Sequence, residues 1–222
     1  MLKIAHRGAS GHALENTKEA FEKAIYLDTE IVEFDVRETK DKKIVVFHDD
    51  RLERTTNSKG KIKNLTLRQL KKITQKNGDF ILTLTEALKI LKNKCGCKID
   101  IKERGIEERV NKAVKRNAME KQTIVTTEYF SVARKIKKIN PRLKVSLGFK
   151  ENFPTEKMIS LAKRAGVDII GPHFSSVNKK LIEEAHKNGL LVDVWGANTE
   201  KEIKKLKLMG VDAITTDYPE KI

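Results

Sequence analysis

Residues 155–170, TEKMISLAKRAGVDII, contain the unit that decides the fold. A helical pattern over 155–165 ends at Gly166, and a short apolar strand follows at once. The same unit recurs twice, with Gly189 before LLVDV and Gly210 before VDAI. Glycine suits this position because it adopts the left-handed conformation that ends many helices at little cost. Helices that alternate with buried strands predict a parallel sheet.

The same alternation extends outward over most of the chain. The pattern predicts helices at 83–93, 104–117, 131–139, 155–165, 176–188 and 199–209. It predicts strands at 2–5, 31–36, 97–101, 122–126, 143–147, 167–170, 190–195 and 213–216. Eight such strands in 222 residues favour a closed (β/α)8 barrel, the TIM barrel, over an open sheet. We expect a single domain over residues 1–222.

Residues 41–82 are too long for a plain loop and predict a small insertion after the second strand. The polar turn at 40–42 predicts that the run 43–48 returns antiparallel to strand 31–36. We expect residues 50–80 to form a small excursion over the barrel mouth.

The formal net charge of +15 raises the question of nucleic-acid binding. The basic excess lies in residues 51–150, where aromatic residues are scarce, so we interpret it as solvated lysine-rich helix faces and expect no nucleic-acid partner. No stretch approaches the roughly 18 apolar residues of a membrane span, and we expect no stable membrane insertion. The N-terminus lacks a signal-peptide pattern, which favours a cytoplasmic location. No oligomeric state is predicted.

The two cysteines, Cys95 and Cys97, lie in one Cys-Gly-Cys and have no further Cys or His ligands at zinc-site spacing. We expect both to be reduced structural thiols.

Polar side chains gather where the predicted strands end, which is where barrel enzymes place their active sites. Glu33 and Asp35 are two residues apart on one strand, so both point to one face, and Asp100 follows on the next strand. Three carboxylates form an all-oxygen site that suits one divalent metal ion, Mg²⁺ or Ca²⁺. The other residues at strand ends are His6, Arg7, His48, Lys102, Trp195 and Asp217.

Five short motifs carry a family resemblance. They are His-Arg-Gly-Ala-Ser-Gly at 6–11, Glu-Asn-Thr at 15–17, Glu-x-Asp at 33–35, Phe-His-Asp at 47–49 and Thr-Asp-Tyr-Pro at 216–219. In these motifs the chain resembles the glycerophosphodiester phosphodiesterase family, over nearly its whole length. The resemblance implies a TIM barrel, a divalent metal and hydrolysis of glycerophosphodiesters to sn-glycerol 3-phosphate and an alcohol. By position it implies His6 and His48 as the general acid/base pair, Arg7 as a phosphate ligand, and Glu33 and Asp35 as metal ligands.

The remaining candidates have supporting roles. We expect Lys102 to be a second phosphate ligand, Asp217 to position Arg7, and Trp195 to form a pocket wall. Glu15 either orients His6 or Arg7, or is only an acidic residue favoured near a helix N-terminus. His12 and His173 are candidates for the pocket rim.

The chain departs from the family pattern at three places. Leu14 replaces the usual proline, Asp100 replaces the usual glutamate, and Gly196 in Trp-Gly-Ala-Asn replaces the usual threonine, which widens the pocket near the leaving group. Aspartate at position 100 also resembles the sphingomyelinase D-like phospholipases. A phospholipase D-like hydrolase of lysophospholipids or sphingomyelin therefore stays an alternative, as does a non-catalytic phosphate-binding barrel.

Overall fold

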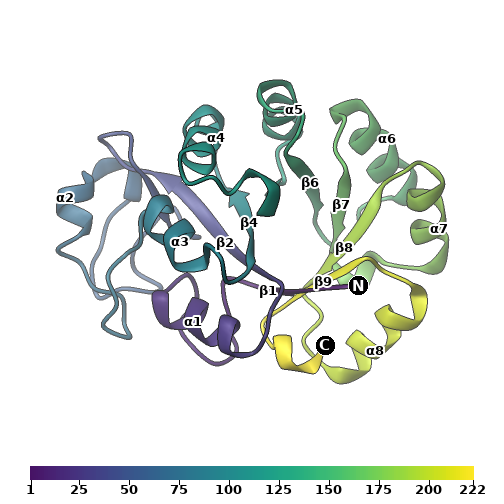
Figure 1. Cartoon of the computed structure of the whole chain (residues 1–222), viewed down its shortest axis with the longest axis horizontal. Helices are drawn as coiled ribbons and strands as arrows, with labels where there is room; N and C mark the ends of the chain where they lie inside the picture. Colours follow the sequence, from purple (N-terminus) through teal and green to yellow (C-terminus); the bar gives the residue numbers. More distant parts are fainter.

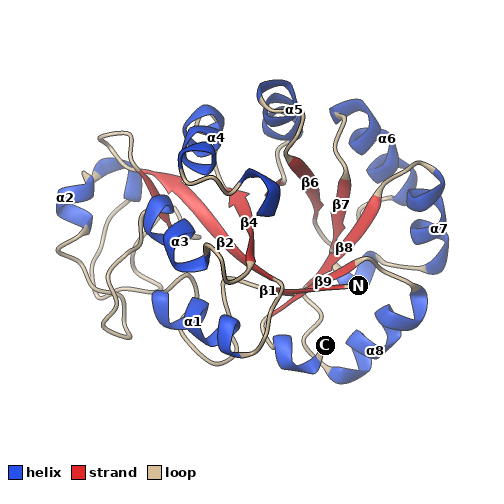
Figure 2. Cartoon of the chain, in the orientation of Figure 1, coloured by secondary structure: helices blue, strands red, loops and turns tan.

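The alternating strands and helices close into a barrel in the computed structural model, which describes residues 1–222 (Figures 1 and 2). Eight parallel strands follow the order β1-β9-β8-β7-β6-β5-β4-β2, and β1 pairs with β2 to close the ring. These strands are β1 (Leu2–Ala5), β2 (Ile31–Glu38), β4 (Gly96–Ile101), β5 (Thr123–Thr127), β6 (Lys144–Phe149), β7 (Ile169–Pro172), β8 (Leu191–Trp195) and β9 (Ala213–Thr216). The predicted TIM barrel is confirmed.

Helices surround the strands on the outside (Figure 2). They are α1 (Lys18–Tyr26), α3 (Leu84–Leu91), α4 (Glu107–Arg116), α5 (Phe130–Ile139), α6 (Thr155–Ala165), α7 (Lys179–Lys187) and α8 (Glu200–Met209). Two of them begin three residues later than predicted. Before α4, Gly105 has a φ of +92°, which is incompatible with a helix. The start of α7 is set by Asn178, whose side chain accepts a hydrogen bond from the backbone N–H of Leu181.

The insertion after β2 begins as predicted, because β3 (Ile44–Val46) returns antiparallel and pairs Val46 with Val36. The segment then contains the short helix α2 (Leu67–Leu70) and a small apolar cluster that includes Phe47, Leu52 and Ile81. Figure 1 shows this segment beside α1 and α3, at one end of the molecule. Its apolar cluster includes Val45 of β3 and packs beside that strand, and the position of residues 50–80 over the barrel mouth stays a prediction.

The interior of the barrel changes from apolar to charged along the strands. At their N-terminal ends, inward-facing side chains such as Ile4, Ile31 and Ile169 form a small apolar layer. Above it, Lys98 pairs with Asp193 and Thr215, all three buried. The residues that follow on the same strands face the C-terminal end of the barrel, so the fold carries its polar groups toward one opening.

Both cysteines are free thiols, as predicted. Burial raises the pKa of Cys97 to about 12 and that of Cys95 to about 11, so both stay protonated at neutral pH. Among the helices, none is both long enough and apolar enough to span a membrane.

The turn after β1 depends on Gly8. Its φ of +82° lies in the left-handed region, and its N–H donates to the carbonyl oxygen of Glu33 on β2. A Cβ on this residue would lie 2.7 Å from the backbone carbonyl carbon of Ala20 in α1. No alanine fits there without moving backbone atoms.

We predict that Gly8→Ala lowers the free energy of unfolding by about 2–4 kcal/mol, because backbone strain and a steric clash add together. Gly166→Ala is the matched control, since Gly166 has a φ of +69° but nothing within 4 Å of its added Cβ. The control should cost only about 1 kcal/mol. Urea denaturation measures both, and equal losses would show that the clash at Gly8 does not matter.

Candidate active site

A cavity of about 130 Å³ opens at the C-terminal ends of the strands. The structure brings seven of the predicted site residues into its lining: His6, Arg7, Glu33, His48, Asp100, Lys102 and Trp195. Trp195 is the single hydrophobic residue among them. The cavity is therefore a polar site for a small charged molecule.

Three carboxylates meet at the base of this cavity. Glu33, Asp35 and Asp100 each place one oxygen within 4.8 Å of the others, and Glu33 and Asp35 are almost completely buried. Burial, followed by the charge of Asp35, raises the pKa of Glu33 to about 7. Burial also raises the pKa of Asp100. Burial acts in the same direction on Asp35, but Lys102 and Arg7 outweigh it and hold the pKa of Asp35 well below its usual range.

The carboxylates fit a divalent cation. Asp35 Oδ1 and Asp100 Oδ1 are buried and accept no hydrogen bond. Lys102 Nζ lies 2.6 Å from Asp100 Oδ2 and 3.1 Å from Asp35 Oδ1, so it supplies one positive charge to three acidic groups. Asp100 Oδ1, which has no partner, and the remaining acidic excess are what one hard metal ion would satisfy. Aspartate at position 100 still brings an oxygen within reach of the other two carboxylates, despite being shorter than the usual glutamate.

His6 is held by a carboxylate from the other end of the chain. Its Nδ1 lies 2.7 Å from Asp217 Oδ1, and Asp217 also accepts hydrogen bonds from Ser10 Oγ and Asn198 Nδ2. Burial tends to raise the pKa of Asp217, but these hydrogen bonds, that of His6 first, lower it to about 2. An ionised Asp217 accepts a hydrogen bond from the Nδ1–H group of His6, which leaves Nε2 of His6 for chemistry.

The expectation that Asp217 positions Arg7 is wrong, because its hydrogen bonds go to His6 and its neighbours instead. Register explains this outcome. Strand β9 pairs with β1, and Ala5 lies opposite Thr216, so the residues that follow each strand, His6 and Asp217, are neighbours.

His48 has a similar arrangement at the end of the antiparallel return. Its Nδ1 lies 2.6 Å from Asp49 Oδ1, and Asp49 in turn accepts from Arg54 Nε at 2.6 Å. Burial lowers the pKa of His48, and nearby Arg7 adds to this, although Asp35 opposes it. His48 is therefore neutral at pH 7, with Nε2 available as a proton acceptor.

Arg54 is a site residue that the sequence analysis missed. Its two terminal nitrogens each lie 2.6 Å from an oxygen of Glu15, whose Oε1 also accepts from Arg7 NH1 at 3.0 Å. One guanidinium thus links Glu15, the partner of Arg7, to Asp49, the partner of His48. Arg54 belongs to none of the quoted motifs. The only signal in the sequence that could have predicted its role is the presence of two acidic site residues, Glu15 and Asp49, that require a cation as partner.

Arg7 and Asn16 connect the opening motifs to the carboxylates. The backbone N–H of Arg7 donates to Glu33 Oε2 at 2.8 Å, and its Nε lies 3.3 Å from Asp35 Oδ2. Asn16, which the sequence analysis did not single out, donates from Nδ2 to Asp35 Oδ2 at 2.8 Å. Both residues have positive φ values, 53° for Arg7 and 59° for Asn16, a conformation that costs energy and is concentrated at functional sites.

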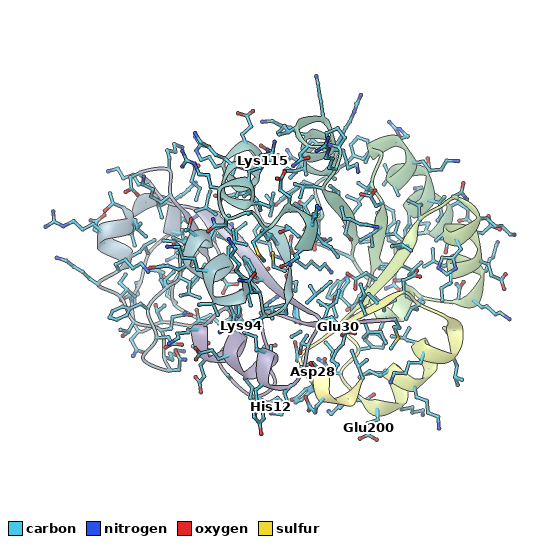
Figure 3. The ribbon with its side chains drawn as sticks, viewed as in Figure 1. His12, Asp28, Glu30, Lys94, Lys115 and Glu200 are labelled. Atoms are coloured by element: carbon cyan, nitrogen blue, oxygen red, sulfur yellow. The ribbon has the colours of Figure 1, made fainter.

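Trp195 forms one wall of the cavity, and its indole N–H donates to the carbonyl oxygen of Phe149. The two other histidines proposed for the rim do not line the cavity. His173 is buried against the Trp195 ring, with a centroid distance of 4.6 Å. His12 lies 3.0 Å from Glu220, and Figure 3 shows it at the lower margin of the molecule. The expectation of a rim position is wrong for both.

Comparison with known proteins agrees with the fold and the motifs. Residues 6–221 match the model of the glycerophosphoryl diester phosphodiesterase family. The chain is 36% identical to the YhdW protein of Bacillus subtilis, over 99% of this chain and 96% of that protein. It is 33% identical to a glycerophosphodiester phosphodiesterase of Caldanaerobacter subterraneus, over 99% of this chain and 95% of that enzyme.

A solved structure gives the same result. A phosphodiesterase of Oleispira antarctica, in complex with the product sn-glycerol-3-phosphate, superposes with a TM-score of 0.91 at 26% identity, over 99% of this chain and 94% of that one. The fold and the polar site define a barrel hydrolase of phosphodiesters. The chain belongs to the glycerophosphoryl diester phosphodiesterase family. The prediction of a phosphodiesterase from the motifs is confirmed.

We predict that Arg54→Met lowers the kcat of phosphodiester hydrolysis about tenfold or more, because Glu15 and Asp49 then lose the cation that fixes their positions beside Arg7 and His48. Arg51→Met is the matched control, since Arg51 pairs only with Glu53 near the surface. Steady-state kinetics at equal folded fraction, verified by circular dichroism, measures the effect. Similar kcat values for both variants would remove Arg54 from the site.

Proposed function

We propose that the protein hydrolyses glycerophosphodiesters to sn-glycerol 3-phosphate and an alcohol, with a divalent metal ion and two histidines. One observation carries this proposal. Two histidines, each supported by a carboxylate at Nδ1, line the same small cavity as Glu33, Asp100 and two cations, Arg7 and Lys102, and buried Asp35 lies beside them. The bound product in the Oleispira structure supports the same substrate class.

Phosphoryl transfer chiefly requires neutralisation of the phosphate oxygens and alignment of the reacting groups. Glu33, Asp35 and Asp100 would hold one Mg²⁺ or Ca²⁺ ion, which when bound supplies positive charge to the phosphoryl group. Arg7 and Lys102 line the cavity beside these carboxylates and bind the phosphate oxygens. Glu15 keeps the Arg7 guanidinium in place through its hydrogen bond to NH1.

The two histidines carry out the proton transfers of the reaction, one as the base and the other as the acid. His48 is neutral at pH 7, so its Nε2 removes a proton from the attacking oxygen of water or of the substrate's glycerol 2-hydroxyl. That oxygen forms a bond to phosphorus as the bond from phosphorus to the alcohol oxygen breaks. His6 donates a proton from Nε2 to the departing oxygen, while Asp217 stabilises the imidazolium form through Nδ1. If the 2-hydroxyl attacks, water opens the cyclic phosphate in a second step.

The composition of the cavity argues against the two alternatives. A lysophospholipid or sphingomyelin needs an apolar groove for its acyl chain, whereas Trp195 is the only hydrophobic residue in the lining. A non-catalytic barrel would not need two histidines aligned by carboxylates around one phosphate site.

We predict that purified protein releases glycerol 3-phosphate from glycerophosphoethanolamine, loses this activity in EDTA, and recovers it when Mg²⁺, Ca²⁺ or Mn²⁺ is added in excess. An enzyme-coupled assay for glycerol 3-phosphate measures the release. Full activity in EDTA after exhaustive dialysis would contradict the metal requirement. Turnover of lysophospholipids alone would instead support the phospholipase alternative.

His6→Ala and His48→Ala should each lower kcat by a factor of about 10² to 10⁴, the usual contribution of a general acid or base. KM should change little, because neither side chain is needed to neutralise the phosphate. His186→Ala is the control, since His186 lies on α7 and pairs with Asp212 away from the cavity. A variant that keeps wild-type kcat would exclude that histidine from the proton transfers.

A further inference from the structure

The cavity has two unlike halves. Strands β1, β2 and β4 carry His6, the carboxylates and Lys102, so the charged groups occupy one side. The order of strands around the barrel places β6 and β7 opposite β1 and β2, and there the lining residues are Gly148 and Gly171. Two glycines leave space without a side chain. A phosphate held by Arg7 and Lys102 therefore has room for one of its substituents on this open side.

Glu128 carries the charge on the open side. It follows β5 directly, its side chain lines the cavity, and a Cβ on Gly148 would lie 3.6 Å from its Cγ. The other two carboxylates in the lining, Glu33 and Asp100, belong to the metal-binding group, so Glu128 is left over. Its nearest cation is Lys150, at 3.4 Å. Because the Lys150 side chain is 76% exposed, solvent screens this pair and Glu128 keeps an effective negative charge.

Trp195 bounds the same open side from the other flank, at the end of β8. Its indole is fixed by a hydrogen bond to Phe149 and by the edge of His173. An aromatic surface and a carboxylate on either side of an open space form a favourable environment for an alkylammonium group.

We propose that Glu128 and Trp195 form the subsite for the alcohol part of the substrate and select an alcohol with a positive charge, an amino alcohol or its quaternary ammonium form, over a neutral polyol. This inference rests on the proposed function, because it assumes a phosphodiester bound at Arg7 and Lys102. The glycerol part is common to all substrates, so a charge preference acts on the variable alcohol alone.

The test compares two esters that differ only in the charge of the alcohol, glycerophosphoethanolamine and glycerophosphoglycerol. We expect wild-type protein to prefer the ethanolamine ester in kcat/KM by about tenfold, and Glu128→Gln to remove most of this preference. The variant should keep its kcat/KM for the neutral ester within about twofold. Glu183→Gln is the matched control, since Glu183 lies on α7, pairs with Lys179 at the surface and does not line the cavity.

Three results would overturn the proposal. An equal loss of kcat/KM on both esters would place Glu128 at the glycerol or phosphate part of the substrate. An equal gain of kcat/KM would place it against the phosphate. Unchanged kcat/KM on both esters would mean that Glu128 faces only solvent and Lys150. Binding of phosphocholine, measured by titration calorimetry, gives a second readout that needs no turnover. We expect Glu128→Gln to weaken it about tenfold, and unchanged affinity would contradict the subsite even if the hydrolysis itself is not observed.

Discussion

The active site depends on one constraint, the packing of three carboxylates, two of them buried, within 4.8 Å of one another at the end of a parallel barrel. Such a group is unfavourable by itself, since burial and mutual repulsion raise the pKa of Glu33 to about 7. The surrounding structure offsets this cost with Lys102, Arg7 and Asn16, each aimed at Asp35. Both cations also line the cavity, so the groups that stabilise the carboxylates are the same groups that we propose for binding the phosphate.

The two histidines are positioned in different ways, one by the closure of the barrel and one by the insertion. His6 follows the first strand and Asp217 follows the last, and they meet because β1 and β9 are paired. His48 depends instead on the insertion, whose Arg54 holds Asp49 and Glu15 together. The first pairing is fixed by the sheet and the second by ion pairs on a surface segment. The site therefore combines a rigid half with a half that can be altered by changes outside the barrel.

Much of this arrangement could be predicted from the sequence, and the failures have physical reasons. Strand ends locate Glu33, Asp35 and Asp100 because side chains alternate regularly along a strand. The partner of Asp217 depends on which strands pair across the closure, which no local pattern encodes. Arg54 was missed because a salt bridge between an insertion and the barrel leaves no periodic signal. Glu128 was missed for a similar reason, since an exposed glutamate after a strand resembles any solvated loop residue.

The account rests on the claim that the three carboxylates bind one divalent cation, and anomalous X-ray scattering from crystals grown with Mn²⁺ tests this most directly. We predict a single anomalous peak within bonding distance of oxygens from Glu33, Asp35 and Asp100, with Lys102 displaced from Asp100. A peak elsewhere, or none at this site at a Mn²⁺ concentration that supports turnover, would contradict the claim.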